Sequence, residues 1–492
     1  MTAIRKNFIF NLTSQLLIVI LPVVAIPYLS RVLGETNIGI FDYTHSVLNY
    51  FILFGCVGMS LYGQREIAFY KNDIFKRSAV FDELLIIRFI TIGISTVAYF
   101  VYSANFTDYP VYYYLFGIEL IASFFDISWF FNGIEDFKLQ AVRNVAVKLI
   151  SIAGVFLFVK DSEDLKLYIL FYSAAIFAGN ISLWPRLRNE VKYVSVKGLN
   201  PVRHIRSLLL MFLPQIATSV YTQLDKTMIG VLTAYNYSEV TYYSQAEKIV
   251  KIALTVITSV GAVMLSRVAN MFAENDLDKI RAYISKSFKF MFFLGLPITA
   301  GLMAVADDFV PVFFGEGYDN VVPCMIALSP LVVIIGISNC LGTQYLLPTN
   351  QINKYTASVV VGMLCNAALN FILIPRYAAI GAVAATLVAE TLVSAVQFCF
   401  VRKNISARVL FFGIKNMICA VLMYICVFFA AKAMPATLPG VAAEVILGCA
   451  VYFIALWLIR DSFFLGLIES MMPTPLKRYF SWLYKTSFKN HS

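Results

Sequence analysis

Long apolar segments alternate with short polar segments along the whole chain. Apolar runs of roughly 20 residues recur, and this is the length that crosses a bilayer as an α-helix. We predict fourteen such spans, with no soluble domain of any size between them. They are predicted at 8–30, 38–62, 82–103, 111–133, 142–160, 165–185, 206–233, 240–265, 286–306, 320–346, 354–374, 378–400, 408–431 and 440–460.

The first two spans depart most clearly from a plain apolar pattern. Pro22 and Pro27 are predicted to interrupt the first span, and a polar turn at Gly34 separates it from the second. Span 2 carries Asp42 and His45, three residues apart and therefore on one helix face. Ionisable groups at such depth usually face a bundle interior or a wet cavity. This hairpin is therefore predicted to form one wall of a polar cavity, with bending points in span 1.

Composition and charge agree with a multi-span membrane protein. Hydrophobic residues make up 60% of the 492 and charged residues only 14%, whereas soluble domains carry about 25% charged residues. The net charge of +10 does not indicate nucleic acid, because 28 of the 39 lysines and arginines lie in loops on one predicted face and five on the other. By the positive-inside rule, both termini are predicted to be cytoplasmic.

A basic connection between spans 6 and 7 divides the predicted spans. We expect a six-helix lobe at 1–186, a cytoplasmic linker at 187–205, a second lobe at 206–403, two extra helices at 404–460 and an amphipathic cytoplasmic tail at 461–492. Weak internal sequence similarity supports the two lobes: FLP at 212–214 resembles ILP at 20–22, and TYYS at 241–244 resembles FDYT at 41–44. An even number of spans per lobe implies a pseudo-two-fold axis along the membrane normal.

The sequence contains none of three common motifs of enzymatic active sites. We find no Walker A sequence, no HExxH and no GxSxG. The eight cysteines lie within apolar runs and lack CxxC spacing, which argues against a disulfide framework or a metal site. We therefore expect neither an enzyme nor a cofactor.

The remaining chemistry is charge within the predicted spans. Asp225 and Lys226 are adjacent on span 7, so their side chains point apart and at least one is expected at a cavity. Glu247 and Lys251 on span 8 are four residues apart, and they form either a structural pair or a functional one. Arg88 on span 3 either serves the cavity or extends toward the cytoplasmic interface.

The opening hairpin resembles a known family. PYLSRVLG, IGIFDY and YGQRE, within residues 27–66, are similar to the N-terminal signature of the polysaccharide biosynthesis family. These proteins are Wzx-type flippases of lipid-linked oligosaccharides, in the superfamily that also holds MATE exporters and lipid II flippases. The resemblance implies an all-α MATE-like fold with a cleft lined mainly by spans 1, 2, 7 and 8. The charges in the spans concentrate on spans 2, 7 and 8.

The function implied is transfer of a polyprenyl-diphosphate-linked oligosaccharide across the cytoplasmic membrane by alternating access. Membrane lipids, H⁺ or Na⁺ for coupling, and a polysaccharide polymerase are the other expected partners. The predicted substrate-binding residues are Arg31, Asp42, His45, Arg65, Arg88, Lys226, Lys248 and Lys251, and the predicted ion-coupling residues are Asp225 and Glu247.

Two alternatives stay open at this point. A MATE-like exporter of cationic drugs has the same fold, but its site should be mainly acidic and aromatic, whereas spans 7 and 8 carry three lysines. A membrane polysaccharide polymerase or ligase belongs to a different class. The short, nearly uncharged outer loops argue against that second alternative.

Overall fold

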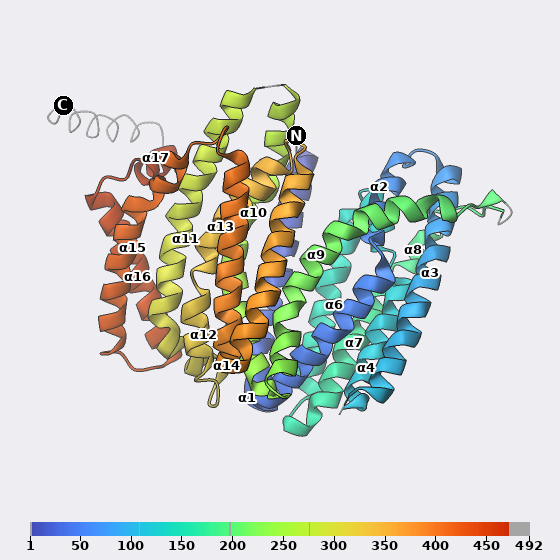
Figure 1. Cartoon of the computed structure of the whole chain (residues 1–492), viewed down its shortest axis with the longest axis horizontal. Coiled ribbons are helices and arrows are strands. Elements are labelled where there is room, and N and C mark those ends of the chain that lie inside the picture. Colours follow the sequence, from blue (N-terminus) through green and yellow to red (C-terminus); the bar gives the residue numbers. More distant parts are fainter. Residues whose placement is uncertain (1, 108, 196–197, 275, 472–492) are drawn as a thin grey trace. The chain divides into compact units, whose positions relative to one another are not determined.

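The computed structural model describes residues 2–107, 109–195, 198–274 and 276–471, and within them every regular element is a helix. Figure 1 shows these helices, several of which are long enough to cross a bilayer. The elements are α1 (Thr2–Cys56), α2 (Met59–Phe69), α3 (Ile74–Asn105), α4 (Pro110–Ala122), η1 (Ser123–Phe125), α5 (Ser128–Gly133), α6 (Phe137–Phe158), η2 (Ser162–Asp164), α7 (Leu165–Ile181), α8 (Trp184–Leu187), α9 (Val202–Leu232), α10 (Tyr237–Ala273), α11 (Leu277–Phe314), α12 (Val321–Leu328), α13 (Leu331–Ser338), the π-helix η4 (Asn339–Leu346), α14 (Ile352–Val401), η5 (Ala407–Gly413), α15 (Ile414–Ala431), α16 (Leu438–Leu458) and α17 (Ser462–Met471).

Helix α1 contains both of the first two predicted spans. Its backbone leaves helical geometry at Gly34, where φ is 76° and ψ is 169°, a conformation open essentially to glycine alone. The prediction that Pro22 and Pro27 interrupt the helix is wrong, because α1 continues through both positions. A proline removes one intrahelical hydrogen bond, and a membrane helix tolerates that loss when neighbouring groups satisfy the freed carbonyl.

Helix α14 likewise contains two predicted spans, separated at Ala378, where φ is 47° and ψ is −128°. Ten stretches of the described chain are long and apolar enough to cross a membrane, and α1 and α14 account for two of them. Helices α9 and α10 occupy predicted spans 7 and 8, where the embedded charges lie. The helices are therefore consistent with fourteen spans, although the exact number stays a prediction.

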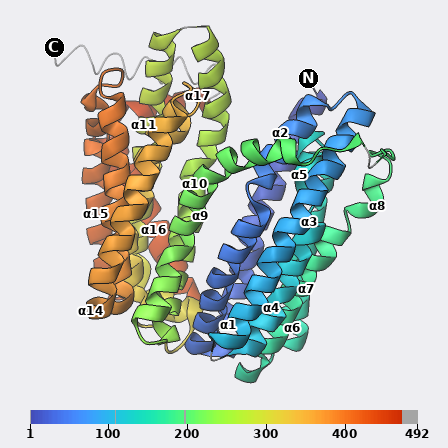
Figure 2. The ribbon, with the colours of Figure 1, turned by 45° about the vertical axis from the view of Figure 1, so that its right-hand side comes forward.

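Packing divides the chain into two compact units. Unit 1 comprises Met1–Gln245, Phe314–Asn320 and Met363–Ala385, and unit 2 comprises the remainder. In unit 1, α1 packs against α3, α4, α6, α7 and α9, and Figure 2 shows several of these helices side by side. A buried core around Trp129, Phe81 and Tyr62 joins α2, α3 and α5. The predicted lobes at 1–186 and 206–403 stay a prediction.

In unit 1, segments that are predicted on the same face of the membrane contact each other. Residues at the predicted outer ends of spans 1 and 5 meet, since the Tyr28 hydroxyl donates to the Val159 carbonyl at 2.6 Å. In the adjoining predicted outer loops, Asn37 Nδ2 donates to the Ser162 carbonyl at 2.8 Å. Segments predicted on the cytoplasmic face also meet, since Lys71 Nζ lies 2.7 Å from Glu135 Oε2. The predicted order of spans is therefore internally consistent in this unit.

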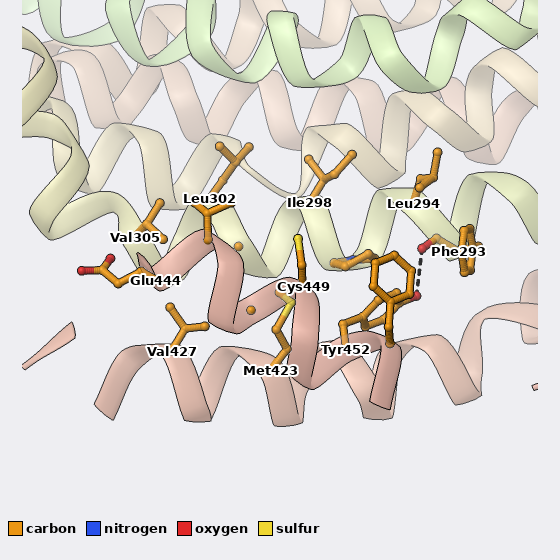
Figure 3. A pocket seen from close by; sticks show the side chains of 15 residues that line it. Phe293, Leu294, Ile298, Leu302, Val305, Met423, Val427, Glu444, Cys449 and Tyr452 are labelled. Atoms are coloured by element: carbon orange, nitrogen blue, oxygen red, sulfur yellow. Dashed lines mark hydrogen bonds between the residues drawn. The ribbon is translucent and has the colours of Figure 1, made fainter. Parts of the chain in front are cut away.

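Unit 2 is built around α11, α15 and α16. Phe293, Met423 and Tyr452 belong to its core, and the Tyr452 hydroxyl donates to the Phe293 carbonyl at 2.8 Å (Figure 3). These helices line a pocket of about 310 Å³, and its lining is apolar apart from Glu444 and the Tyr452 hydroxyl. Helix α17 begins the predicted cytoplasmic tail, and residues 472–492 of that tail lie outside the described residues.

Candidate substrate and ion sites

The predicted site residues fall in both units. Unit 1 holds seven of them, and unit 2 holds Glu247, Lys248 and Lys251 on α10. Those in unit 1 do not form one cluster. They lie in separate polar groups on helices α1, α2, α3 and α9, and each group has partners that the sequence could not reveal. The seven are Arg31, Asp42, His45, Arg65, Arg88, Asp225 and Lys226.

Asp225 is the centre of a buried polar network on α9. Its side chain is 5% exposed, and the Tyr243 hydroxyl donates to Oδ2 at 2.5 Å. Asn370 Nδ2 donates to Oδ1 at 2.7 Å and to Asn366 Oδ1 at 3.1 Å. The donors come from α10 and α14, so three helices meet at one carboxylate. Sequence reasoning missed the two asparagines, although their spacing of four on an apolar span was a usable signal.

Asp42 is also held by α10. Its Oδ2 accepts a 2.5 Å hydrogen bond from the Ser244 hydroxyl, and the residue is 7% exposed. Ser244 is the last residue of the TYYS segment, which resembles FDYT at 41–44, so the two similar segments contact each other in unit 1. Glu35 was not predicted, yet its Oε2 accepts from the Tyr242 hydroxyl at 2.7 Å at the same junction.

His45 pairs with Glu119 of α4. The two groups approach to 3.3 Å between Nε2 and Oε2, with side chains 23% and 11% exposed. On the other side of the imidazole ring, Asn49 Nδ2 lies 3.3 Å from Nδ1 and also donates to the His45 carbonyl at 2.8 Å. Phe116 and Tyr172 place their rings 5.4 and 5.5 Å from the imidazole. Glu119 falls within predicted span 4, but nothing in the sequence joins it to His45.

Arg88 does not extend to an interface. Its side chain is 1% exposed, Nε donates to the Ser123 carbonyl at 2.7 Å, and Nη2 lies 3.5 Å from Asp126 Oδ2. The suggestion that Arg88 reaches toward the cytoplasmic interface is therefore wrong, because η1 and the turn after it supply its partners inside the unit. A buried arginine with a carboxylate and a carbonyl as partners is placed to join α3 to the end of α4.

The other predicted arginines lie at the surface of unit 1. Arg65 is exposed, with Nη2 3.0 Å from Glu66 Oε1 and its guanidinium 5.3 Å from the centre of the Tyr62 ring. Arg31 is also exposed, and it lies against Gly315. Neither side chain is enclosed, so each can meet a ligand only at a surface of its own unit.

The three predicted lysines differ in exposure. Lys226 on α9 and Lys248 on α10 are half-buried, whereas Lys251 is 51% exposed. Lys251 Nζ lies 2.5 Å from Glu247 Oε1, and Glu247 is 11% exposed, so the predicted pair forms. Lys226 lies in unit 1 and the other two lysines in unit 2, and a half-buried ammonium group within an apolar helix is costly.

A buried ionic cluster lies at the start of α9 and was not predicted. Glu83 of α3 is 2% exposed, and its Oε2 lies 2.7 Å from His204 Nε2 and 2.6 Å from Arg203 Nη2. The Tyr62 hydroxyl lies 2.7 Å from His204 Nδ1. The end of the predicted linker is therefore attached to α2 and α3, and its basic composition gave no sign of this.

Comparison with known proteins identifies the family. The sequence model of the family described as "Polysaccharide biosynthesis protein" matches residues 4–272, more than half of the chain. The chain belongs to this family. It is 24% identical over 407 residues to a putative O-antigen transporter of Escherichia coli (strain K12), a match that covers 82% of the chain and 97% of the relative. It is also 24% identical to a probable lipid II flippase MurJ of Rhizobium tropici, over 58% of the chain and 54% of the relative.

Solved structures show the fold. A lipid II flippase MurJ in an inward closed conformation superposes with a TM-score of 0.73 at 16% identity, covering 92% of this chain and 99% of the other. An inward-facing multidrug resistance MATE family transporter gives 0.61 at 13% identity, covering 82% and 98%. The expected family and the all-helical fold shared with MATE proteins are thus confirmed. The protein is a multi-span membrane protein of transporter architecture.

Proposed function

We propose that the protein moves a polyprenyl-diphosphate-linked oligosaccharide from the inner to the outer leaflet of the cytoplasmic membrane. The observation that carries this proposal is the family match over residues 4–272, together with the O-antigen transporter that aligns over 97% of its length. The probable lipid II flippase and a probable low-salt glycan biosynthesis flippase of Haloferax volcanii support the same class of cargo. The chain then acts as a transporter and performs no covalent chemistry.

The physical obstacle is the head group of the cargo. Sugars and a diphosphate of about two negative charges cannot cross hydrocarbon unaided. In the proposed mechanism lysines contact the diphosphate while the polyprenyl tail stays in lipid; the candidates are Lys226 in unit 1 and Lys248 and Lys251 in unit 2. Transport proceeds by alternating access, driven by an H⁺ or Na⁺ gradient, in a chain with both termini in the cytoplasm. A polysaccharide polymerase then uses the transported oligosaccharide.

The MATE-like fold alone would also suit a drug exporter. Charge separates the two functions, because a site for cationic drugs needs carboxylates that are open to the ligand. Asp225 and Asp42 are instead held by Tyr243, Asn370 and Ser244. The lysines on α9 and α10 favour an anionic cargo, in agreement with the family.

The lysine-to-glutamine variants test the anion site. In a host that lacks its own flippase, Lys226→Gln and Lys248→Gln should each lower surface polysaccharide at least about tenfold, the equivalent of one charge-assisted contact of about 1.4 kcal/mol. Lys166→Gln is the matched control, because Lys166 is exposed at the start of α7. Protein abundance in the membrane is measured in parallel, and lipid-linked oligosaccharide should accumulate in the inner leaflet.

Lys251 needs a second variant because it is paired. Lys251→Gln leaves Glu247 without the ammonium 2.5 Å away, so a loss of transport could come from the carboxylate that remains. The double change Glu247→Gln with Lys251→Gln removes both charges. A role in diphosphate binding predicts that the double variant stays impaired, whereas recovery assigns the pair to structure. Normal polymer levels in all three single-lysine variants would place the diphosphate site elsewhere.

A further inference from the structure

We propose that His45 and Glu119 form the proton-binding site that couples transport to a proton gradient, an inference that rests on the proposed function. The pair lies within one unit and joins α1 to α4 across 3.3 Å. Asp225 and Glu247 were the sequence-predicted coupling residues. Asp225 is 5% exposed, and its two carboxylate oxygens accept hydrogen bonds from Tyr243 and Asn370. Glu247 forms an ion pair with Lys251. The His45–Glu119 pair has a titratable group on each side.

Depth in the membrane favours this pair. His45 lies eleven residues beyond the Gly34 turn, which is about 16 Å of helix, and Glu119 lies nine residues into α4, about 14 Å. Both therefore lie near the middle of a hydrocarbon layer about 30 Å thick. A net charge is costly at this depth, so the state of the pair must be controlled by its surroundings. The His45 side chain is 23% exposed, which leaves a route for a proton.

The hydrogen bonds around His45 indicate which imidazole nitrogen carries the hydrogen before a transported proton binds. Asn49 Nδ2 also donates to the His45 carbonyl, so its amide points a donor at Nδ1 of the ring. Nδ1 is then the acceptor, and Nε2 carries the hydrogen that is directed at Glu119. In the proposed unloaded state this neutral imidazole faces an ionised carboxylate, so the pair carries one negative charge.

One added proton makes the pair electrically neutral. It enters either on a Glu119 oxygen, giving a neutral carboxyl, or on Nδ1, giving an imidazolium beside a carboxylate. In both cases the net charge changes from −1 to 0, and no other reactant is needed. Protonation at Nδ1 also removes the acceptor that Asn49 uses. That change lies within α1, since Asn49 and His45 are four residues apart on one helix. The added proton also changes the contact between His45 and Glu119, which joins α1 to α4 and is the kind of local contact that can bias two conformations.

Aromatic side chains surround the pair, so a change of one charge there is not neutralised by its nearest neighbours. Phe41 stacks on the imidazole at 5.8 Å and Phe116 is fully buried, so the ring lies among aromatic groups that cannot neutralise it. Other titratable or charged side chains on the elements packed around the pair include Asp42 on α1, Arg88, Tyr99 and Tyr102 on α3, Tyr113 on α4, Arg143 and Lys148 on α6, Tyr168 and Tyr172 on α7, and Asp225 and Lys226 on α9. Of these, Tyr172 lies against the imidazole ring.

The chain offers a direct measurement of proton binding without substrate. It has three histidines, His45, His204 and His491, so ¹⁵N labelling of histidine gives three sets of ring signals. His45→Gln identifies the His45 set. We expect the wild-type His45 signals to show the Nε2–H form at high pH and to respond to pH, and we expect Glu119→Gln to change that response. An identical pH response of His45 in wild type and Glu119→Gln would overturn the proposal.

Transport under an imposed gradient is the second readout. A gradient of about one pH unit is worth about a tenfold ratio per proton coupled, so wild-type flipping in proteoliposomes should change by up to that factor. The ratio of rates with and without the gradient should fall to about one in Glu119→Gln and in His45→Gln. His204→Gln is the matched control, because His204 also pairs with a buried glutamate, Glu83 at 2.7 Å, at the other end of unit 1; its ratio should stay at the wild-type value.

The possible outcomes separate the two proposals. A gradient ratio that survives in Glu119→Gln, or a wild-type rate that follows Na⁺ and ignores pH, overturns the proton site while flipping itself stands. An equal loss of the ratio in His204→Gln also overturns it, since any buried histidine–glutamate pair would then suffice. Absence of flipping in wild type overturns the proposed function, and the ring signals of His45 still decide whether the pair binds a proton.

Discussion

At the scale of single residues, the sequence located the embedded charges but not their partners. Hydrophobic context alone reveals that Asp225 and Arg88 lie within apolar helices. Their partners come from elsewhere in the chain: Asn370 is 145 residues from Asp225, and Asp126 is 38 residues from Arg88. Such pairings depend on which helix faces meet, and a single sequence does not contain that information. The positions of these embedded charges were therefore predictable, whereas most of their partners were not.

Arg88 yields a stability prediction at this scale. Arg88→Met removes a charge that is 1% exposed and leaves the Ser123 carbonyl and Asp126 without their donor. Breaking a buried pair costs about 3–5 kcal/mol, and less here because Asp126 is 27% exposed, so we expect a loss of about 2–3 kcal/mol. Thermal unfolding of the purified protein measures it.

Arg65→Met is the control for that measurement. Arg65 is exposed and pairs with Glu66 at 3.0 Å, and such a surface pair contributes about 0–1 kcal/mol. Arg88→Met should therefore unfold at a clearly lower temperature than Arg65→Met. Equal unfolding temperatures for the two variants would mean that Arg88 does not stabilise the junction of α3 and α4, and its role as a substrate contact would regain support.

At the scale of helices, the apolar pattern predicted the elements well and their interruptions poorly. Spans 1 and 2 and spans 11 and 12 each appear as one helix with a single non-helical residue, Gly34 or Ala378. Proline was the expected point of interruption, since it lacks the N–H of the helical ladder. A direction change needs a positive φ, however, and glycine supplies it at Gly34. Alanine at 378 carries no such signal, so the second turn could be placed only by the lengths of the spans.

The two turns give predictions of opposite sign. Gly34→Ala places a Cβ at φ 76°, where a non-glycine residue costs about 1–3 kcal/mol, and no neighbouring atom lies within 4 Å of it, so strain alone acts. Ala378→Gly relieves similar strain at φ 47°, offset by about 0.5–1 kcal/mol for the added freedom of glycine in the unfolded chain. We expect Gly34→Ala to lower and Ala378→Gly to raise the unfolding temperature. Shifts in the same direction would show that the turns are not the strained points.

At the scale of the whole molecule, the all-helical membrane fold and the family were predictable, because the first depends on composition and the second on one N-terminal motif. Orientation depends on the loop charges, and the division into lobes depends on contacts between distant segments. In unit 1 the loops predicted on one face contact each other, as the rings of Tyr109 and Tyr237 do at 6.1 Å and as the Asn200 backbone N–H and Glu83 do at 2.7 Å. One labelled position at each end therefore reports the orientation of many loops.

Cysteine labelling tests the predicted orientation. The native thiols must first be replaced, above all the exposed Cys399 and Cys449. In sealed cells, single cysteines at Tyr109 and Asn236 should react with a reagent that cannot cross the membrane, because both positions lie in loops predicted to face outward. A cysteine at Asn200 should react only after the membrane is opened.

The physical reason is the charge bias, since 28 basic residues in the loops of one face resist transfer across the membrane. Reaction at Asn200 in sealed cells, with protection at Tyr109, would reverse the orientation while leaving the helix hairpins intact. Reaction at both ends from the same side would contradict the hairpins themselves, because Tyr109 and Asn200 lie in loops separated by helices α4, α6 and α7.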